Sequence, residues 1–430
     1  MAFKIETFQN RHLPPGSHRI DAILSVTADG KQSASAVPGG TLVVGFIIDK
    51  SGSMQGDRSR SVINAVSRAI ALLPEPSGFF VVAFDESAKI VVPAMAASAE
   101  NKAIAAQHLA GLQAGGGTAM STGLGAARAI FEQYPTCIRQ AVFITDGKNE
   151  SERKQLVIAE LARCVDMFEC DCWGVGTDWK VGEVQEIATA LLGKAALIPE
   201  PAGIEAAFRA AIEKASAKTF KDVRLRLWTP AGATVVFVKQ VNPTIEELTH
   251  KARAISAQVR EYMTGAWGGA ESRDFHVAVE VKQGGVGDEM LAARPSVAYQ
   301  AMNAGAWVEV EDKPAEGRLF ATWSADDSLT SRIDGHVAHY TGQDELASAI
   351  VQGLEAREKG DEAQATHLLG RAVQIAHASN NVEMTHRLKK VVEVVEAATG
   401  TIKLRKDVKK SAEMDLQLES RTTKRVAKGG

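Results

Sequence analysis

One stretch of this sequence decides the fold: Thr41-Leu42-Val43-Val44-Gly45-Phe46-Ile47-Ile48-Asp49-Lys50-Ser51-Gly52-Ser53. From Leu42 to Ile48 the residues are apolar or glycine, which is typical of a strand buried on both faces of a parallel sheet. A D-x-S-x-S pattern follows at once and supplies one carboxylate and two hydroxyl groups. Because all three groups carry oxygen donors, they suit one half of a site for a hard divalent cation.

Strand-length apolar runs alternate with helix-length segments from residue 41 to about residue 218. This alternation predicts a parallel, doubly wound α/β domain over residues 41–218. One apolar run, 88–92, follows its neighbour after a turn that is too short for a parallel crossover, so we expect an antiparallel hairpin at the sheet edge. The predicted strands are 42–48, 79–84, 140–145, 172–176 and 195–198, and the predicted helices are 57–74, 98–112, 120–133, 152–168, 181–192 and 203–217.

Oxygen-bearing side chains occur at three places where this domain is expected to bind a ligand. In a parallel sheet the carboxyl ends of the strands meet at one edge, and ligands bind there. Two of the three groups directly follow a predicted strand, and the third follows the glycine turn 115–117, which lets the backbone approach a ligand closely. The oxygen donors are Asp49, Ser51, Ser53, Thr118 and Asp146.

The order of these five residues resembles the metal-ion-dependent adhesion site of the von Willebrand factor A domain, an integrin I-like fold. Its signature is D-x-S-x-S, a later Thr and a later Asp, and the resemblance covers roughly two-fifths of the chain. It implies that Ser51, Ser53 and, in the ligand-competent state, Thr118 contact Mg²⁺ directly, while Asp49 and Asp146 act largely through bound water. Mn²⁺ accepts the same hard ligands. A Mg²⁺ held this way keeps part of its charge, so the expected further ligand is an Asp or Glu of a protein partner.

Residues beside the metal motifs are candidates for the rim that a partner would contact. Met54 follows the first motif, Lys148 follows Asp146 after one glycine, and Asp178 and Trp179 follow the strand 172–176. For Trp179 two interpretations stay open, because a loop tryptophan either anchors a partner or packs on its own domain. The resemblance further implies that affinity could switch through movement of the last helix of the domain, within residues 201–218.

The regions that flank the α/β domain have the pattern of a second domain. Residues 219–323 alternate between apolar and polar with a period of two, which predicts an antiparallel β-sandwich. Residues 1–40 show the same alternation before the break at Pro38-Gly39-Gly40, so their strands are predicted to complete the sandwich. The α/β domain would then be inserted between sandwich strands. The resemblance supports this arrangement, because larger bacterial and eukaryotic proteins with an A domain are similar in this respect.

The C-terminal part is predicted to be helical over residues 324–400. Two interpretations are a helical lid on the sandwich and a single tetratricopeptide-type hairpin. Residues 401–430 contain nine Lys or Arg against four Asp or Glu, and alternation at Ile402 and Leu404 and at 414–418 predicts short strands before a basic exposed tail. Its threonines beside basic residues suggest a docking segment that depends on phosphorylation, and the alternative is a solvated end.

The composition of the chain excludes some classes of function. With 430 residues, a formal net charge of −3 and no apolar run long enough for a membrane span, the chain predicts neither a nucleic-acid partner nor membrane insertion. Its four cysteines have no nearby His and fit reduced thiols in the cytoplasm better than zinc ligands. We expect a cytoplasmic scaffold or regulatory subunit and no enzyme. The alternative is a metal-dependent phosphate-ester hydrolase, although no His stands beside the metal motifs to act as a general base.

Overall fold

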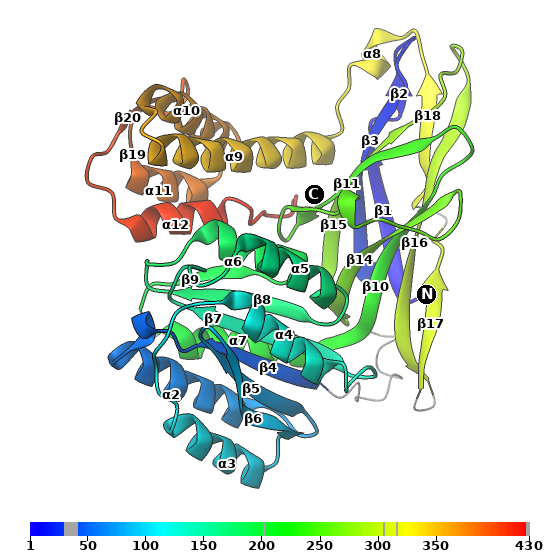
Figure 1. Ribbon diagram of the computed structural model, residues 1–430. Coiled ribbons are helices and arrows are strands. Elements are labelled where there is room, and N and C mark those ends of the chain that lie inside the picture. The colour runs from blue at the N-terminus through cyan, green and yellow to red at the C-terminus, as the bar shows by residue number, and fades with distance from the viewer. Residues whose placement is uncertain (30–41, 201–202, 304–305, 315–316, 427–430) are drawn as a thin grey trace.

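The computed structural model describes residues 1–29, 42–200, 203–303, 306–314 and 317–426. It consists of an α/β domain, a β-sandwich and a C-terminal helical region (Figure 1). The predicted break at Pro38-Gly39-Gly40, the first residue of the predicted α/β domain, Thr41, and the end of the predicted tail, 427–430, lie outside the described residues. None of the helices in the described part of the chain is both long enough and apolar enough to cross a lipid bilayer.

The α/β domain is built on a six-stranded sheet, and all its strands are parallel except β6 at one edge. β6 pairs antiparallel with β5, so the predicted edge hairpin is confirmed. In spatial order the strands are β6 (Ala88–Ala96), β5 (Gly78–Phe84), β4 (Leu42–Asp49), β7 (Ile138–Thr145), β8 (Glu169–Val175) and β9 (Ala195–Ile198).

Helices cover both faces of this sheet, as the doubly wound prediction requires. Val44 and Phe46 of β4 pack toward α2, α3 and α7, while Val43 and Ile47 pack toward α4, α5 and α6. Every residue of β4 is buried because both of its faces are covered. The helices are α2 (Asp57–Leu72), α3 (Ala99–Ala110), α4 (Met120–Phe131), α5 (Lys154–Cys164), α6 (Val181–Ala190) and α7 (Ile204–Ser216).

Two sheets form the sandwich and enclose one apolar core. The first contains β1 (Phe3–Gln9), β3 (Arg19–Ala28), β15 (Ser272–Glu280), β11 (Thr234–Asn242) and β12 (Glu246–Glu247). The second contains β13 (Arg253–Ala254), β14 (Val259–Gly268), β10 (Lys218–Trp228), β16 (Glu289–Asn303), β18 (Leu319–Trp323), β2 (His12–Leu13) and β17 (Ala306–Asp312).

The N-terminal strands belong to this sandwich. β3 lies between β1 and β15, and Leu24 of β3 is opposite Phe275 of β15. Strands from before and after the α/β domain therefore share one sheet. The predicted insertion of the α/β domain into the sandwich is confirmed.

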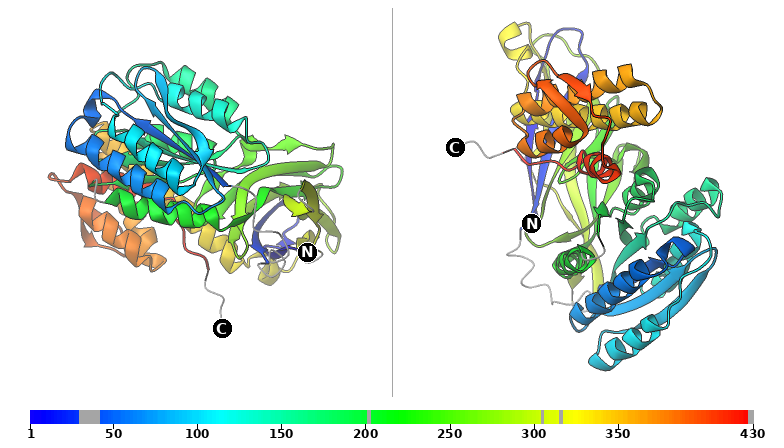
Figure 2. Two further views of the ribbon diagram at one scale, coloured as in Figure 1. Left: turned by 90° about the horizontal axis from the view of Figure 1, so that it is seen from below. Right: turned by 90° about the vertical axis from the view of Figure 1, so that its left-hand side faces the viewer.

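The C-terminal region packs against both other parts of the molecule. Its helices and a small hairpin share one core, α9 also touches the sandwich through Val337 and Tyr340, and α12 lies against the α/β domain (Figure 2). The lid interpretation therefore describes only part of its packing. The elements are α8 (Asp327–Thr330), α9 (Gly335–Glu358), α10 (Glu362–Ala378), α11 (Val382–Val391), β19 (Val392–Glu396), β20 (Thr401–Leu404) and α12 (Lys410–Glu419).

The predicted strand at 414–418 is wrong, because this segment is helix α12. Met414 and Leu418 are four residues apart and pack on the α/β domain, while Leu416, between them, packs into the helical core. A helix that is buried on two sides therefore produced the alternation that suggested a strand.

The predicted exposed tail is also wrong for the two threonines after α12, although Lys424 beside them is exposed. Thr423 is buried, and its hydroxyl donates a hydrogen bond of 2.5 Å to the carbonyl of Val241 on β11. The hydroxyl oxygen of Thr422 is buried as well. Neither threonine is presented to solvent, so the structure contradicts the idea of a phosphorylation-dependent docking segment at these positions.

Candidate metal centre

All five predicted metal residues meet at the carboxyl edge of the α/β sheet. Asp49 is the last residue of β4, and Asp146 directly follows the neighbouring strand β7. Ser51 and Ser53 lie at the short 3-10 turn that follows β4, and Thr118 lies just ahead of α4. Adjacent parallel strands therefore bring together residues that are far apart in the sequence.

Hydrogen bonds link four of these residues. The Asp49 carboxylate accepts one hydrogen bond from the Ser51 backbone N–H at 2.8 Å and another from the Thr145 hydroxyl at 2.6 Å. The Ser51 and Ser53 hydroxyl oxygens are 3.0 Å apart, and Ser53 donates to Asp146 Oδ1 at 2.6 Å. The two carboxylates thus lie behind a layer of hydroxyl groups.

Thr145 is a positioning residue that the sequence analysis missed. It is fully buried at the end of β7 and orients the Asp49 carboxylate. Its signal was a threonine ending a buried apolar strand directly before Asp146.

Thr118 joins the same group because residue 147 is a glycine. A Cβ atom at Gly147 would lie 3.2 Å from Thr118 Oγ1 and 3.4 Å from Ser53 Oγ. The space over Gly147 is therefore the place where the hydroxyls of the second and first motifs converge.

The glycine turn is fixed to the first motif by backbone hydrogen bonds. The N–H of Gly52 donates to the carbonyl of Gly116 at 2.9 Å, and the N–H of Gly115 donates to the carbonyl of Lys50 at 2.7 Å. Gly116 has a φ of +86°, a conformation that favours glycine. Lys50 also forms an ion pair with Asp85 at the end of β5.

The loop after β7 holds the start of α4 beside the site. Asn149 Oδ1 accepts from the Met120 N–H at 3.0 Å, and Ser151 Oγ accepts from the Thr118 N–H at 2.9 Å. Glu183 of α6 in turn accepts a hydrogen bond of 3.1 Å from the Asn149 N–H. The Asn149 contact caps the first turn of α4 and the other two hold the flanking loops in place, and the sequence analysis assigned none of them.

Burial makes the site unfavourable for negative charge in the absence of a cation. Burial of the Asp49 carboxylate raises its pKa above the ordinary value for aspartate; hydrogen bonds from Thr145 and Ser51 oppose the rise, and the charge of Asp146 adds to it. A bound cation would favour the ionised carboxylates and so relieve this cost.

The residues present fit a hard divalent cation. They surround a pocket of about 340 Å³ that is lined by hydroxyl, carboxylate and glycine groups. Oxygen donors of this kind suit Mg²⁺ or Mn²⁺, whereas structural zinc sites use Cys and His. In the described residues, no group of three or more His, Cys, Asp or Glu could hold a metal, so the candidate site depends on its hydroxyl donors as well as its carboxylates.

Two of the four predicted rim residues lie at this pocket and two do not. Lys148 and Asp178 line it, together with Glu150, which the sequence analysis did not assign. Met54 and Trp179 are each only 1% exposed, so neither can contact a partner at the rim.

Trp179 packs on its own domain. A Cβ atom at Gly174 would lie 1.8 Å from its ring, which shows how closely the indole covers this glycine. The indole N–H donates to the carbonyl of Gly176 at 3.0 Å. Of the two interpretations left open by the sequence, internal packing is therefore the observed one.

Comparison with known proteins identifies the class defined by this fold and site. The model of the von Willebrand factor type A domain matches residues 43–197, and the model of the von Willebrand factor type A C-terminal domain matches residues 374–420. A von Willebrand factor type A protein from Catenulispora acidiphila is 36% identical, with a TM-score of 0.90 over 99% of this chain and 97% of that chain. The chain belongs to the von Willebrand factor type A family.

More distant relatives share part of this similarity. The ArnB paralog VWA2 from Sulfolobus acidocaldarius has the same fold, with a TM-score of 0.61 and 12% identity over 98% of this chain and 99% of that chain. The uncharacterized protein sll0103 from Synechocystis is 28% identical over 222 residues, which are 50% of this chain and 52% of that protein. The chain thus spans about half the length of this curated relative. Domains of the family typically act as metal-dependent protein-interaction modules.

Proposed function

We propose that this protein is a Mg²⁺-dependent protein-interaction module, acting in the cytoplasm as a scaffold or regulatory subunit. The observation that carries the proposal is the convergence of three hydroxyl groups and the Asp146 carboxylate at one pocket, with the buried Asp49 carboxylate next to them through Ser51. If the neutral hydroxyls contact the cation directly and the carboxylates act through bound water, the cation keeps part of its charge, which favours an acidic side chain of a partner as a further ligand.

Each residue has a role in this proposal. Ser51, Ser53 and Thr118 would hold the cation through neutral hydroxyl oxygens, while Asp49 and Asp146 would accept hydrogen bonds from hydroxyls and from bound water. The cation, when bound, supplies the positive charge that attracts an anionic ligand. Mn²⁺ could replace Mg²⁺ because both accept hard oxygen donors.

The same geometry gives less support to a phosphate-ester hydrolase. Hydrolysis needs a group that can take a proton from water; no His is among the described residues that line this pocket, and the carboxylates there are the other candidates. Asp49 is engaged by Ser51 and Thr145, and Asp146 accepts a hydrogen bond from Ser53. We therefore propose a binding role without catalysis.

The proposal can be tested by affinity capture from a native lysate, with the 430-residue chain in Mg²⁺ or in EDTA. The variants are Asp49→Ala and Ser53→Ala, and the matched control is Asp327→Ala at an exposed position on α8. A partner held by wild type and by the control in Mg²⁺, and lost in EDTA and in both variants, would support the proposal. A partner that survives both chelation and Asp49→Ala would contradict it, and titration of the free protein with Mg²⁺ tests the metal site on its own.

A further inference from the structure

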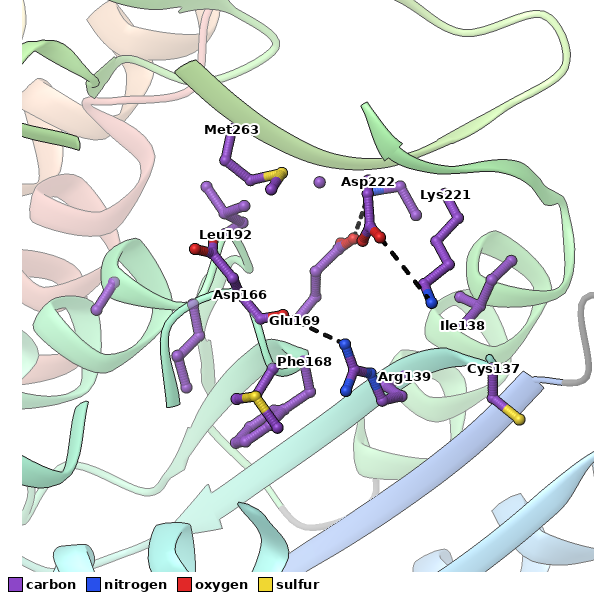
Figure 3. Close-up of a pocket in the computed structure, with 15 residues that line it drawn as sticks. Cys137, Ile138, Arg139, Asp166, Phe168, Glu169, Leu192, Lys221, Asp222 and Met263 are labelled. Atoms are coloured by element: carbon purple, nitrogen blue, oxygen red, sulfur yellow. Dashed lines mark hydrogen bonds and ion pairs between the residues drawn. The ribbon is translucent and has the colours of Figure 1, made fainter. Parts of the chain in front are cut away.

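A second pocket lies where the α/β domain meets the sandwich, at the opposite end of the sheet from the metal centre. It has a volume of about 40 Å³ and is lined by residues of both domains (Figure 3). On one side is Arg139, near the start of β7, and on the other is Lys221 of β10. Since β7 ends at Thr145 beside the metal residues, this strand joins the two sites.

Two cations reach this pocket without a close carboxylate partner. The Lys221 side chain is only 9% exposed; its ammonium donates to the carbonyl of Pro135 and lies 3.9 Å from Asp222. The Arg139 guanidinium donates to the backbone carbonyl of Asp166 at 3.3 Å. Within the part of the chain that the structure describes, neither cation has a carboxylate oxygen within 3.5 Å.

Three carboxylates also line the pocket, but two of them are already neutralised. Glu169 accepts from the ammonium of Lys218 and, at 2.5 Å, from the N–H of Ala266. Asp166 forms an ion pair with Arg253. Only Asp222, whose side chain is 38% exposed, remains to balance the two cations. When Lys218 and Arg253 are counted with the groups that line the pocket, four cations face three carboxylates, an excess of one positive charge.

Burial disfavours the charged forms of both cations. It lowers the pKa of the Lys221 ammonium, and the nearby Arg139 charge lowers it further, although Asp222 opposes both effects. Burial also lowers the pKa of the Arg139 guanidinium. A negative charge between the two groups would favour both protonated forms.

We propose that this pocket binds a small tetrahedral oxyanion, with inorganic phosphate or sulfate as the class, between the Arg139 guanidinium and the Lys221 ammonium. A volume of about 40 Å³ is several times the ~10–15 Å³ that one water needs, so it has room for one such ion. The guanidinium can donate two parallel hydrogen bonds to oxyanion oxygens, and the ammonium acts as a compact point charge. The ion would link a cation of the α/β domain to one of the sandwich and so stabilise their interface.

The test is thermal unfolding of dialysed full-length protein in sulfate or phosphate, against chloride at equal ionic strength. We expect a saturable rise in the unfolding temperature, because a ligand that binds only the folded state stabilises it by mass action. Arg139→Gln and Lys221→Met should each weaken the apparent affinity at least tenfold. Lys221→Arg, which keeps the charge, should retain most of it.

Matched controls separate this site from general salt effects. Arg260→Gln and Lys282→Gln remove exposed cations of the sandwich and should leave the response unchanged. An equal rise in all variants, or no rise in wild type, would overturn the proposal. Soaking crystals in selenate gives the position directly: an anomalous peak between Arg139 and Lys221 supports the site, and peaks only elsewhere contradict it.

Discussion

The metal end of the α/β domain and the segment Arg421–Val426 are both fixed by side-chain hydrogen bonds, but the partners come from different sources. At the metal end, Asp49 ends a strand, Ser53 and Asp146 follow strands of the same sheet, and the parallel order of the strands brings them together. The segment Arg421–Val426 is instead held by the sandwich and by α9. The topology of a parallel sheet therefore allows the contacts at the metal end to be predicted from a sequence motif. No comparable rule predicts the contacts of the segment Arg421–Val426.

Asp274 of β15 is the centre of the second set. This carboxylate is 2% exposed and accepts hydrogen bonds of 2.5 Å from both Ser25 and Tyr340. Arg425 adds two more, at 2.7 Å and 3.1 Å. Burial of the Tyr340 hydroxyl and its bond to Asp274 raise its pKa well above the usual value, so it stays a donor at every physiological pH. The basic segment that resembles a solvated end in the sequence therefore supplies, through Arg425, the positive charge that neutralises the buried Asp274 carboxylate.

The largest expected effect comes from breaking this ion pair with Arg425→Met. It would leave the Asp274 charge buried with only neutral donors, and breaking a fully buried pair costs about 3–5 kcal/mol. The Arg425 side chain is 36% exposed, so we expect a smaller loss of unfolding free energy, about 2–3 kcal/mol. The checks are the urea midpoint and faster hydrogen exchange in β3 and β15.

The control for this prediction is the adjacent cation. Lys424→Met removes a side chain that is 68% exposed and paired with Glu383 at 3.1 Å, so we expect a change below about 0.5 kcal/mol. Equal losses in the two variants would mean that Arg425 is no more structural than a surface residue. The contrast between the two regions would then fail.

Sequence patterns predicted those elements in which each face of the helix or strand has a single environment, buried or exposed. The strand Leu42–Asp49 is buried on both faces and read as a continuous apolar run, and the insertion followed from strands of alternating polarity on both sides of the α/β domain. Helix α12 was missed because it faces two cores at once, so Met414, Leu416 and Leu418 alternate although the segment is helical.

The candidate metal residues could be predicted because they lie at or just after strand ends, whose position in the sheet follows from the sequence. The residues of the rim could not be predicted in the same way. Proximity in sequence to a motif does not fix the direction of a side chain. Met54 follows a motif residue as closely as Lys148 does, and Trp179 follows the end of a neighbouring strand, yet both point into cores because apolar surface is available there. Thr145 was missed because a threonine in a buried strand has no signal beyond its position.

A smaller effect is expected from Thr145→Val, which tests whether the metal end is held by its own hydrogen bonds. The nearly isosteric change removes the donor to the Asp49 carboxylate, and a hydrogen bond to a charged group contributes about 1.5–3 kcal/mol. We expect a loss of unfolding free energy near the lower limit, because Ser51 still donates to Asp49. Affinity for Mg²⁺ should fall about tenfold or more, as for other groups that orient ligands.

Urea unfolding and calorimetric titration with Mg²⁺ measure these two quantities. Thr366→Val is the matched control, because its hydroxyl bonds only to the Glu362 carbonyl on the exposed side of α10. If Thr145→Val binds Mg²⁺ as wild type does, Asp49 does not need this donor, and the proposed role of Thr145 in positioning is wrong.

The smallest expected effect is a gain in stability from Asp49→Asn in EDTA. The raised pKa of Asp49 means that the folded state holds its proton more tightly than the unfolded state does. This contribution to wild-type stability is fully present below the ordinary pKa of aspartate, about 3.9, and is lost as the pH rises through the raised value. At neutral pH the variant, which carries no charge there, should be more stable by roughly 1 kcal/mol, a usual size for stability given up at a functional site.

Addition of Mg²⁺ should reverse that order, because wild type gains the free energy of metal binding and Asp49→Asn gains much less. The measurement is the urea midpoint of wild type and of Asp49→Asn, from acid to neutral pH, in EDTA and in Mg²⁺. Asp327→Asn on α8 is the control. A wild type that is more stable than Asp49→Asn in EDTA at neutral pH would show that the buried carboxylate supports the fold, as Asp274 does. The metal end would then resemble the contacts of the segment Arg421–Val426. The Asp49 carboxylate would stabilise the folded state by itself, and a cation would not be needed to offset its charge.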